Sequence, residues 1–134
     1  MNEHARPISV LIADDEAPIL EILTRKFVAE GFDVRSASDG RSALERARER
    51  TPDVVVTDLQ MPLMSGLELA QALRAAHPTR DVPVLLLTAR GYLAAASDLS
   101  HTNIRMTHPK PFSARKIVDL VRAIVEATTM RGAA

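Results

Sequence analysis

"VVVTDLQMP", residues 54–62, opens as an apolar, β-branched run and changes character abruptly at Asp58. Val54, Val55 and Val56 are typical of a strand that is buried on both faces, as the strands of parallel sheets are. A carboxylate at the end of such a strand is costly unless it is paired or binds a metal ion. The stretch therefore predicts a parallel sheet and makes Asp58 a candidate functional residue.

The same alternation of short apolar runs with helical periodicity continues along the whole chain. The strands are expected at residues 8–13, 32–37, 53–57, 82–88 and 103–108. The helices are expected at residues 17–29, 41–50, 66–76 and 91–101, with a last helix through Ile117 and Val125. Strict βα alternation predicts an α/β fold of the doubly wound (βα)5, flavodoxin-like type, a three-layer sandwich with a parallel sheet in the order 2-1-3-4-5. We expect one domain over residues 7–127, with tails at 1–6 and 128–134.

The composition excludes several classes of protein. The chain of 134 residues has 17 Lys and Arg against 17 Asp and Glu, and a net charge of zero does not predict direct binding to nucleic acid. The absence of cysteine excludes disulfides, thiolate metal sites and a cysteine nucleophile. No run approaches the roughly 18 apolar residues of a membrane span, and no signal peptide is evident, so we expect a cytoplasmic protein without membrane contact.

The polar residues that interrupt these runs fall at the same end of every strand. Asp14 and Asp15 follow the first strand, Asp58 ends the third, Thr88 ends the fourth and Lys110 follows the fifth. In an open doubly wound sheet, ligands bind at the carboxyl ends of the strands, where the strand order reverses. The first and third strands are neighbours in this order, so we expect their carboxylates to share one pocket.

Three converging carboxylates repel one another, and two arrangements relieve the repulsion. Either a carboxyl group takes up a proton because its pKa is raised, or a hard cation such as Mg²⁺ binds. The Lys110 ammonium and the Thr88 hydroxyl suit a phosphoryl group beside that cation, which makes Asp58 the candidate nucleophile. Taken singly, Asp14 and Asp15 are equally consistent with helix capping, and Lys110 with a solvated lysine.

Four short motifs in this order resemble the receiver domain of two-component response regulators. They are "ADDE" (13–16), "TDLQMPLMSG" (57–66), "LLLTA" (85–89) and "KPF" (110–112), and the resemblance covers roughly residues 7–127. It implies that Asp58 is the phosphoacceptor, and that Asp14, Asp15, Asp58 and the backbone carbonyl of Gln60 bind Mg²⁺. It further implies that Thr88 is the switch hydroxyl, that Lys110 contacts the phosphoryl group, and that the Lys110–Pro111 peptide bond is cis. Gln60 and Arg90 occupy the positions at which the family tunes dephosphorylation.

One position departs from the family pattern. Three residues before Lys110, where the family usually carries Tyr or Phe, this chain has Thr107. Threonine does not fill the same cavity, so the relay from Thr88 to an aromatic ring is in question.

The resemblance implies a signalling domain rather than a metabolic enzyme. Its partners would be a histidine kinase or histidine phosphotransfer protein and an unidentified downstream protein, and we expect a stand-alone receiver that is a monomer or weak homodimer. The alternatives are a receiver-like scaffold or dimerisation module that does not switch, and a small Mg²⁺-dependent phosphatase. The phosphatase is disfavoured because Gln60 stands where a general acid would be expected.

Overall fold

The computed structural model of the chain describes residues 6–89, 99 and 102–133, with side chains as far as residue 129. Its sheet has five parallel strands in the order β2-β1-β3-β4-β5. These are β1 (Ser9–Ala13), β2 (Asp33–Ala37), β3 (Val54–Asp58), β4 (Val84–Thr88) and β5 (Ile104–Pro109). The helices are α1 (Ala17–Ala29), α2 (Gly40–Glu49), α3 (Gly66–Arg74) and α5 (Ala114–Ala133). The predicted fold class and strand order are confirmed, whereas the helix expected at 91–101 falls almost entirely outside the described residues.

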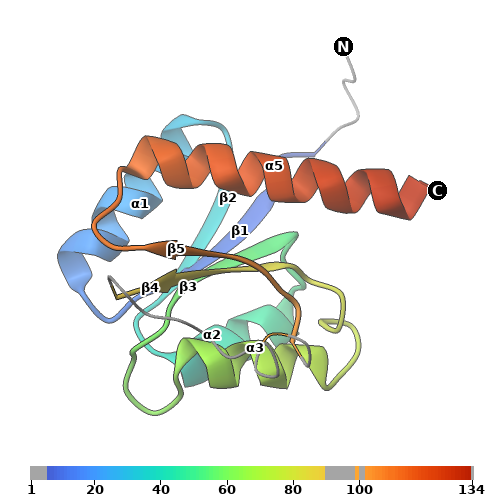
Figure 1. Ribbon diagram of the computed structural model, residues 1–134, viewed down its shortest axis with the longest axis horizontal. Coiled ribbons are helices and arrows are strands. Elements are labelled where there is room, and N and C mark those ends of the chain that lie inside the picture. The colour runs from blue at the N-terminus through green and yellow to red at the C-terminus, as the bar shows by residue number, and fades with distance from the viewer. Residues whose placement is uncertain (1–5, 90–98, 100–101, 134) are drawn as a thin grey trace.

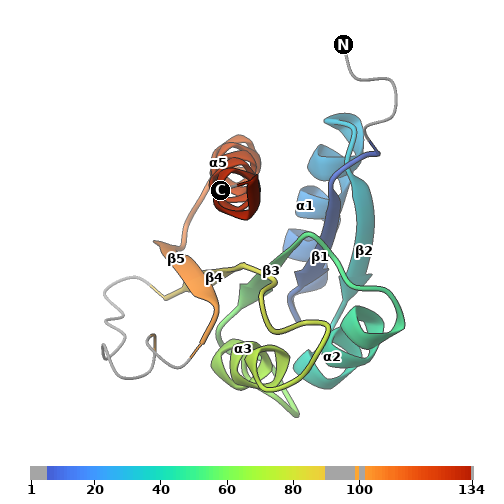
Figure 2. The same ribbon diagram turned by 90° about the vertical axis from the view of Figure 1, so that its right-hand side faces the viewer.

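Helices cover both faces of the sheet. Figures 1 and 2 show α1 and α5 on one side and α2 and α3 on the other. The three valines of β3 pack into both hydrophobic cores. Val54 and Val56 belong to the core beneath α1 and α5, and Val55 belongs to the core beneath α2 and α3. All five residues of β1, β3 and β4 are buried. The prediction of a strand buried on both faces is therefore confirmed.

Local signals in the sequence account for several helix boundaries. The Asp39 carboxylate accepts a hydrogen bond from the Ser42 N–H at 2.7 Å and caps α2. Ser65 and Glu68 form a reciprocal capping box at the start of α3. At the other end of α2, the Arg35 guanidinium of β2 donates to the carbonyl groups of Arg46 and Arg50. The Arg46 carbonyl also accepts the Arg50 N–H, so the Arg35 side chain adds a second donor to it and supplies one to the Arg50 carbonyl at the helix end.

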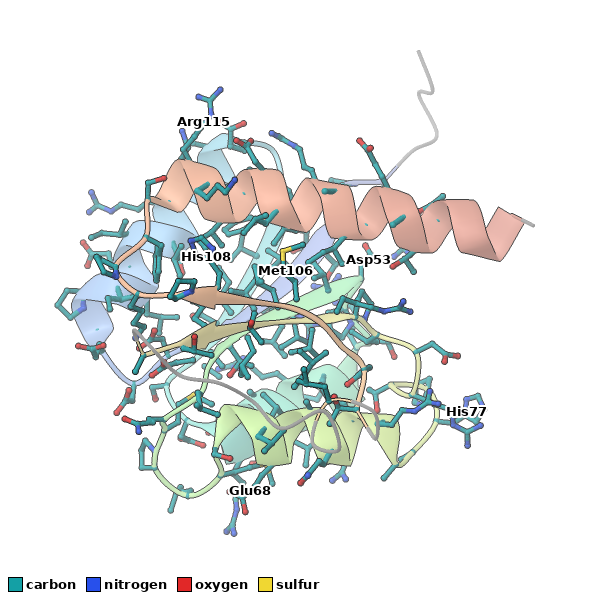
Figure 3. The ribbon with its side chains drawn as sticks, in the orientation of Figure 1. Asp53, Glu68, His77, Met106, His108 and Arg115 are labelled. Carbon is teal, nitrogen blue, oxygen red and sulfur yellow. The ribbon has the colours of Figure 1, made fainter. Side chains whose placement is uncertain are left out.

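Two elements differ from their expected limits. The last helix continues to Ala133, through most of the segment expected as a tail, because no proline or glycine interrupts the chain between Ser113 and Gly132. The strand β5 forms an edge of the sheet, and its register against β4 shifts between Ile104 and Met106. Met106 lies beneath α5 (Figure 3) and packs against the core there. Among the described residues, none of the helices has the length and apolar character needed to cross a membrane.

Candidate functional site

The sheet brings the acidic residues together at the carboxyl ends of β1 and β3. These strands pair directly, with Ala13 beside Thr57, so the residues that follow, Asp14 and Asp58, are neighbours. One carboxylate oxygen from each of Asp14, Asp15 and Asp58 lies within 4.8 Å of the others. Asp14 is fully buried and Asp58 is 7% exposed, whereas Asp15 is exposed. Burial of two of the three carboxylates makes this cluster electrostatically costly in the absence of a cation.

The backbone that carries Asp58 is held in place by the loop before α3. The Gly66 N–H donates to the Leu59 carbonyl at 2.8 Å, and the Thr57 hydroxyl donates to the Asp58 carbonyl at 3.0 Å. A side chain at Gly66 would collide with that same Asp58 carbonyl, so this position requires glycine. The loop therefore fixes the position from which the Asp58 carboxylate enters the site.

Lys110 enters the site from the loop between β5 and α5. Its backbone N–H donates to the Thr88 carbonyl at 2.8 Å, and its peptide bond to Pro111 is cis. Its Nζ lies 3.2 Å from Asp58 Oδ1 and 3.5 Å from Asp14 Oδ2. The ammonium is thus placed between the two buried carboxylates and partly neutralises them.

A third carboxylate contacts the same lysine. Glu16 Oε2 lies 3.1 Å from Lys110 Nζ, and Glu16 begins α1 without capping it through its side chain. Glu16 is not among the residues that the sequence predicted to act at this site. The available signal was its place directly after the acidic pair in "ADDE", within reach of the same strand ends.

The protonation behaviour of the site follows from burial and from this ion-pair network. Burial raises the pKa of Asp14, helped by the Asp58 charge and opposed by the Glu16 N–H and by Lys110. Burial also raises the pKa of Asp58, with Asp15 acting in the same direction and Lys110 opposing it. For Lys110, burial acts to lower the pKa, but its hydrogen bonds with Glu16 and Asp58 outweigh burial and raise the pKa.

The residues of this cluster fit a hard divalent cation. Asp14 Oδ2 is buried and accepts no hydrogen bond from any described residue, and the Lys110 ammonium lies 3.5 Å from it. An oxygen atom of this kind, next to two further carboxylates and with no sulfur or imidazole ligand in the cluster, suits Mg²⁺. Asp14, Asp15 and Asp58 would hold the ion. It would reduce the repulsion among the carboxylates and neutralise charge on a phosphoryl group.

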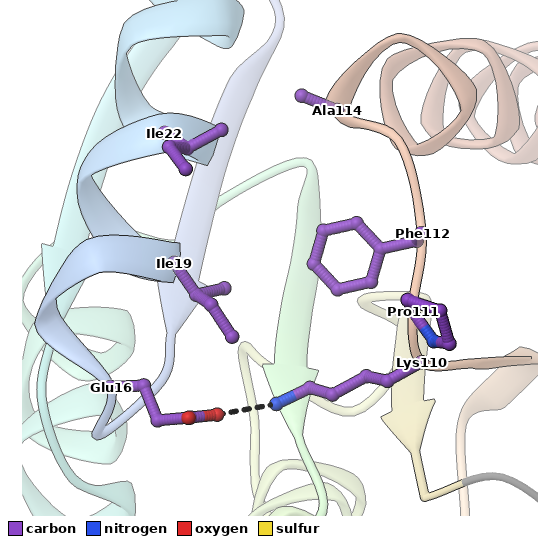
Figure 4. Close-up of a pocket in the computed structure, with 7 residues that line it drawn as sticks. All are labelled: Glu16, Ile19, Ile22, Lys110, Pro111, Phe112 and Ala114. Carbon is purple, nitrogen blue, oxygen red and sulfur yellow. Dashed lines mark hydrogen bonds and ion pairs between the residues drawn. The ribbon is translucent and has the colours of Figure 1, made fainter.

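Two pockets meet at this edge of the sheet. A polar pocket of about 400 Å³ opens onto the cluster and is lined by Asp15, Glu16, Asp58, Leu59, Gln60, Ala89 and Lys110. A more apolar pocket of about 470 Å³ lies between α1 and the loop after β5, lined by Glu16, Ile19, Ile22, Lys110, Pro111, Phe112 and Ala114 (Figure 4). Glu16 and Lys110 belong to both, so their ion pair separates the polar pocket from the apolar one.

The other residues singled out in the sequence lie in different surroundings. Thr88 is buried at the end of β4, and Gln60 is exposed at the polar pocket. Thr107 is exposed on β5, and Arg90 lies outside the described residues. His77 follows α3 at the end away from the site (Figure 3).

The fold and site together define a class: a flavodoxin-like domain whose acidic, lysine-bearing pocket lies at the switch point of the sheet. Residues 10–122 match the family model described as "Response regulator receiver domain", and the chain belongs to this family.

Relatives and solved structures agree with this assignment. The "Probable transcriptional regulatory protein TcrX" of Mycobacterium tuberculosis is 37% identical over 131 residues, which cover 92% of this chain and 52% of that protein. The chain spans about half the length of the curated relatives it matches. The chemotaxis response regulator CheY4 of Vibrio cholerae has a TM-score of 0.81 and 26% identity over 88% of this chain and 98% of its own. The receiver domain of Francisella response regulator 1452 has a TM-score of 0.79 and 30% identity over 89% of this chain and 97% of its own.

Proposed function

We propose that this chain is a phosphorylatable receiver that accepts a phosphoryl group on Asp58 from a histidine kinase or a histidine phosphotransfer protein, with Mg²⁺. The observation that carries the proposal is the position of the Asp58 carboxylate. It lies 3.2 Å from the Lys110 ammonium, within a polar pocket that also contains two further carboxylates. A histidine kinase draws on ATP, so we place this exchange in the cytoplasm.

The chemistry is a displacement at phosphorus. A carboxylate oxygen of Asp58 forms a bond to phosphorus while the P–N bond of the donor phosphohistidine breaks, and the departing imidazole nitrogen keeps the electron pair and takes a proton. Lys110 binds a phosphoryl oxygen, and the Thr88 hydroxyl donates to another. In hydrolysis, a water oxygen forms a bond to phosphorus while the bond between Asp58 oxygen and phosphorus breaks, so inorganic phosphate leaves and the Asp58 carboxylate is restored. Gln60 and Arg90 would tune the rate of this step.

The signal would leave the domain through protein–protein contact, as phosphorylation shifts the balance between two conformations. We expect a monomer or weak homodimer. The exposed Thr107 on β5 favours a second candidate function, a receiver-like scaffold that keeps the acidic pocket but does not switch. The two candidates differ in whether phosphorylation changes regions far from the pocket.

The test is incubation with Mg²⁺ and acetyl phosphate, followed by intact-mass measurement. One phosphoryl adduct is expected on the wild-type chain and none on Asp58→Asn, with Asp53→Asn as a control that keeps the site intact. The absence of an adduct with any small-molecule donor or cognate kinase would overturn the proposal.

Amide NMR spectra with and without beryllium fluoride then separate the two candidates. A switching receiver shows shifts that reach β5 and α5, whereas the scaffold shows shifts confined to the pocket.

A further inference from the structure

The Lys110 ammonium already lies among three carboxylates before any phosphoryl group arrives. Its Nζ lies 3.1 Å from Glu16, 3.2 Å from Asp58 and 3.5 Å from Asp14. A lysine ammonium has only three N–H donors, and here three carboxylates surround it. The Nζ donates a hydrogen bond to Glu16, whereas Asp14 Oδ2 accepts none, so a phosphoryl oxygen on Asp58 would compete with Glu16 for the lysine charge and its donors.

The three carboxylates differ in how easily they release the lysine. Asp14 and Asp58 are buried at strand ends, and both belong to the cluster that suits the cation. The Glu16 side chain is 58% exposed, reaches Lys110 from the N-cap position directly before α1 and lies outside that cluster. A part-exposed ion pair is weak, because water readily replaces either partner. Glu16 is the partner whose contact is most easily exchanged for a phosphoryl oxygen.

The ion pair between Glu16 and Lys110 also lies where it can hinder the approach of an anion to Asp58. Figure 4 shows Glu16 on α1 and Lys110 on the loop after β5 joined by an ion pair, with apolar side chains from both elements beyond it. While the pair is closed, the lysine is shared and a carboxylate stands at the edge of the polar pocket through which an anionic donor must approach. Both effects oppose binding of an anion at Asp58.

We propose that Glu16 is a positioning residue that competes with the phosphoryl group for Lys110 and so restrains phosphorylation of Asp58. This inference rests on the proposed function, since it concerns the same phosphoacceptor. Glu16 neither contacts phosphorus nor belongs to the set of residues that would hold the cation. Its effect is exerted through the lysine.

The first experiment measures the initial rate of Asp58 phosphorylation against acetyl phosphate concentration, at saturating Mg²⁺. Glu16→Gln is expected to lower the half-saturating concentration of acetyl phosphate roughly two- to five-fold, the range spanned by a part-exposed ion pair, and to leave the maximal rate nearly unchanged. Glu21→Gln removes a charge of similar exposure from the same helix and is the matched control, expected to be without effect. Glu16→Asp keeps the charge but is too short to hold the contact, so it should behave like Glu16→Gln.

The second experiment needs neither metal nor phosphoryl donor. Amine acylation of the metal-free protein, followed by peptide mass analysis, gives the labelling rate of Lys110, with Lys26 and Lys116 as internal references. Both Glu16 variants should raise Lys110 labelling, and Glu21→Gln should not.

The outcomes separate this inference from the proposed function. If no variant forms an adduct, the proposed function fails and the labelling rates alone decide whether Glu16 holds the lysine. An unchanged or higher half-saturating concentration in Glu16→Gln overturns the competition. Unchanged Lys110 labelling does the same, and wild-type behaviour of Glu16→Asp would show that charge alone, without the contact, is responsible.

Discussion

Replacing Asp14 by asparagine should stabilise the metal-free protein. The change keeps the side-chain oxygen that accepts the Glu16 N–H at 2.8 Å, and it removes one of three negative charges that lie within 4.8 Å of one another. At an effective dielectric constant of about 20, each repulsion at that distance is worth about 3.5 kcal/mol, and the attraction to Lys110 at 3.5 Å about 4.7 kcal/mol. Two repulsions against one attraction leave about 2 kcal/mol in favour of neutralising Asp14.

Solvent screens the repulsion between Asp14 and the exposed Asp15, which reduces the stabilisation expected from Asp14→Asn. The asparagine also avoids the desolvation cost of the buried carboxylate, which increases that stabilisation. We therefore expect Asp14→Asn to raise the free energy of unfolding by about 1–2 kcal/mol, which corresponds to an increase of roughly 3–8 °C in the midpoint of thermal unfolding. The assay is differential scanning calorimetry in a chelator at neutral pH, with the exposed Asp119→Asn as the control.

The stability difference between Asp14→Asn and the wild type should depend on pH in a definite direction. The pKa of Asp14 is raised above its ordinary value of 3.8, so the metal-free wild type loses stability as pH rises from about 3.8 through the folded-state pKa. The advantage of Asp14→Asn should accordingly vanish below pH 3.8, where the carboxyl group is protonated in both the folded and the unfolded chain. Added Mg²⁺ should stabilise the wild type but much less the variant. A variant that is less stable than the wild type at neutral pH, or that keeps its advantage at pH 3, would refute this electrostatic reasoning.

Three further substitutions test the contacts that support the Asp58 backbone and the ends of α2. Gly66→Ala places a methyl group against the Asp58 carbonyl and should cost about 1–3 kcal/mol in urea unfolding, together with slower phosphorylation. Arg35→Ala removes two hydrogen bonds to carbonyl groups at the end of α2 and should cost about 1–2 kcal/mol by the same measurement, whereas Arg25→Ala should stay within about 0.5 kcal/mol. Asp39→Ala removes the cap of α2 and should cost about 1 kcal/mol at neutral pH. Because the Ser42 N–H lowers the pKa of Asp39, this cost should disappear as pH falls below 3.8 through that lowered pKa.

The sequence predicted the acidic cluster because topology alone determines it. Once βα alternation indicates a doubly wound sheet, every strand ends at the same edge, and Asp14 and Asp58 become neighbours without any knowledge of side-chain conformations. The contact of Glu16 with Lys110 has no such rule, since it joins residues 94 positions apart through two flexible side chains. The same holds for Arg35, whose hydrogen bonds reach from a strand to the end of a neighbouring helix. Contacts of this kind depend on packing between layers, which periodicity does not encode.

The edge strand β5 ends in Pro109, which pairs with Thr88. The Lys110 N–H points inward to the Thr88 carbonyl, and backbone groups of a strand alternate in direction, so the nitrogen of Pro109 faces away from the sheet. Proline has no N–H on this outward side, so its presence leaves the hydrogen bonds between β4 and β5 intact. A strand of another molecule that paired with β5 would lack a hydrogen-bond donor at this position. The residue beside Lys110 thus also protects the protein from edge-to-edge aggregation.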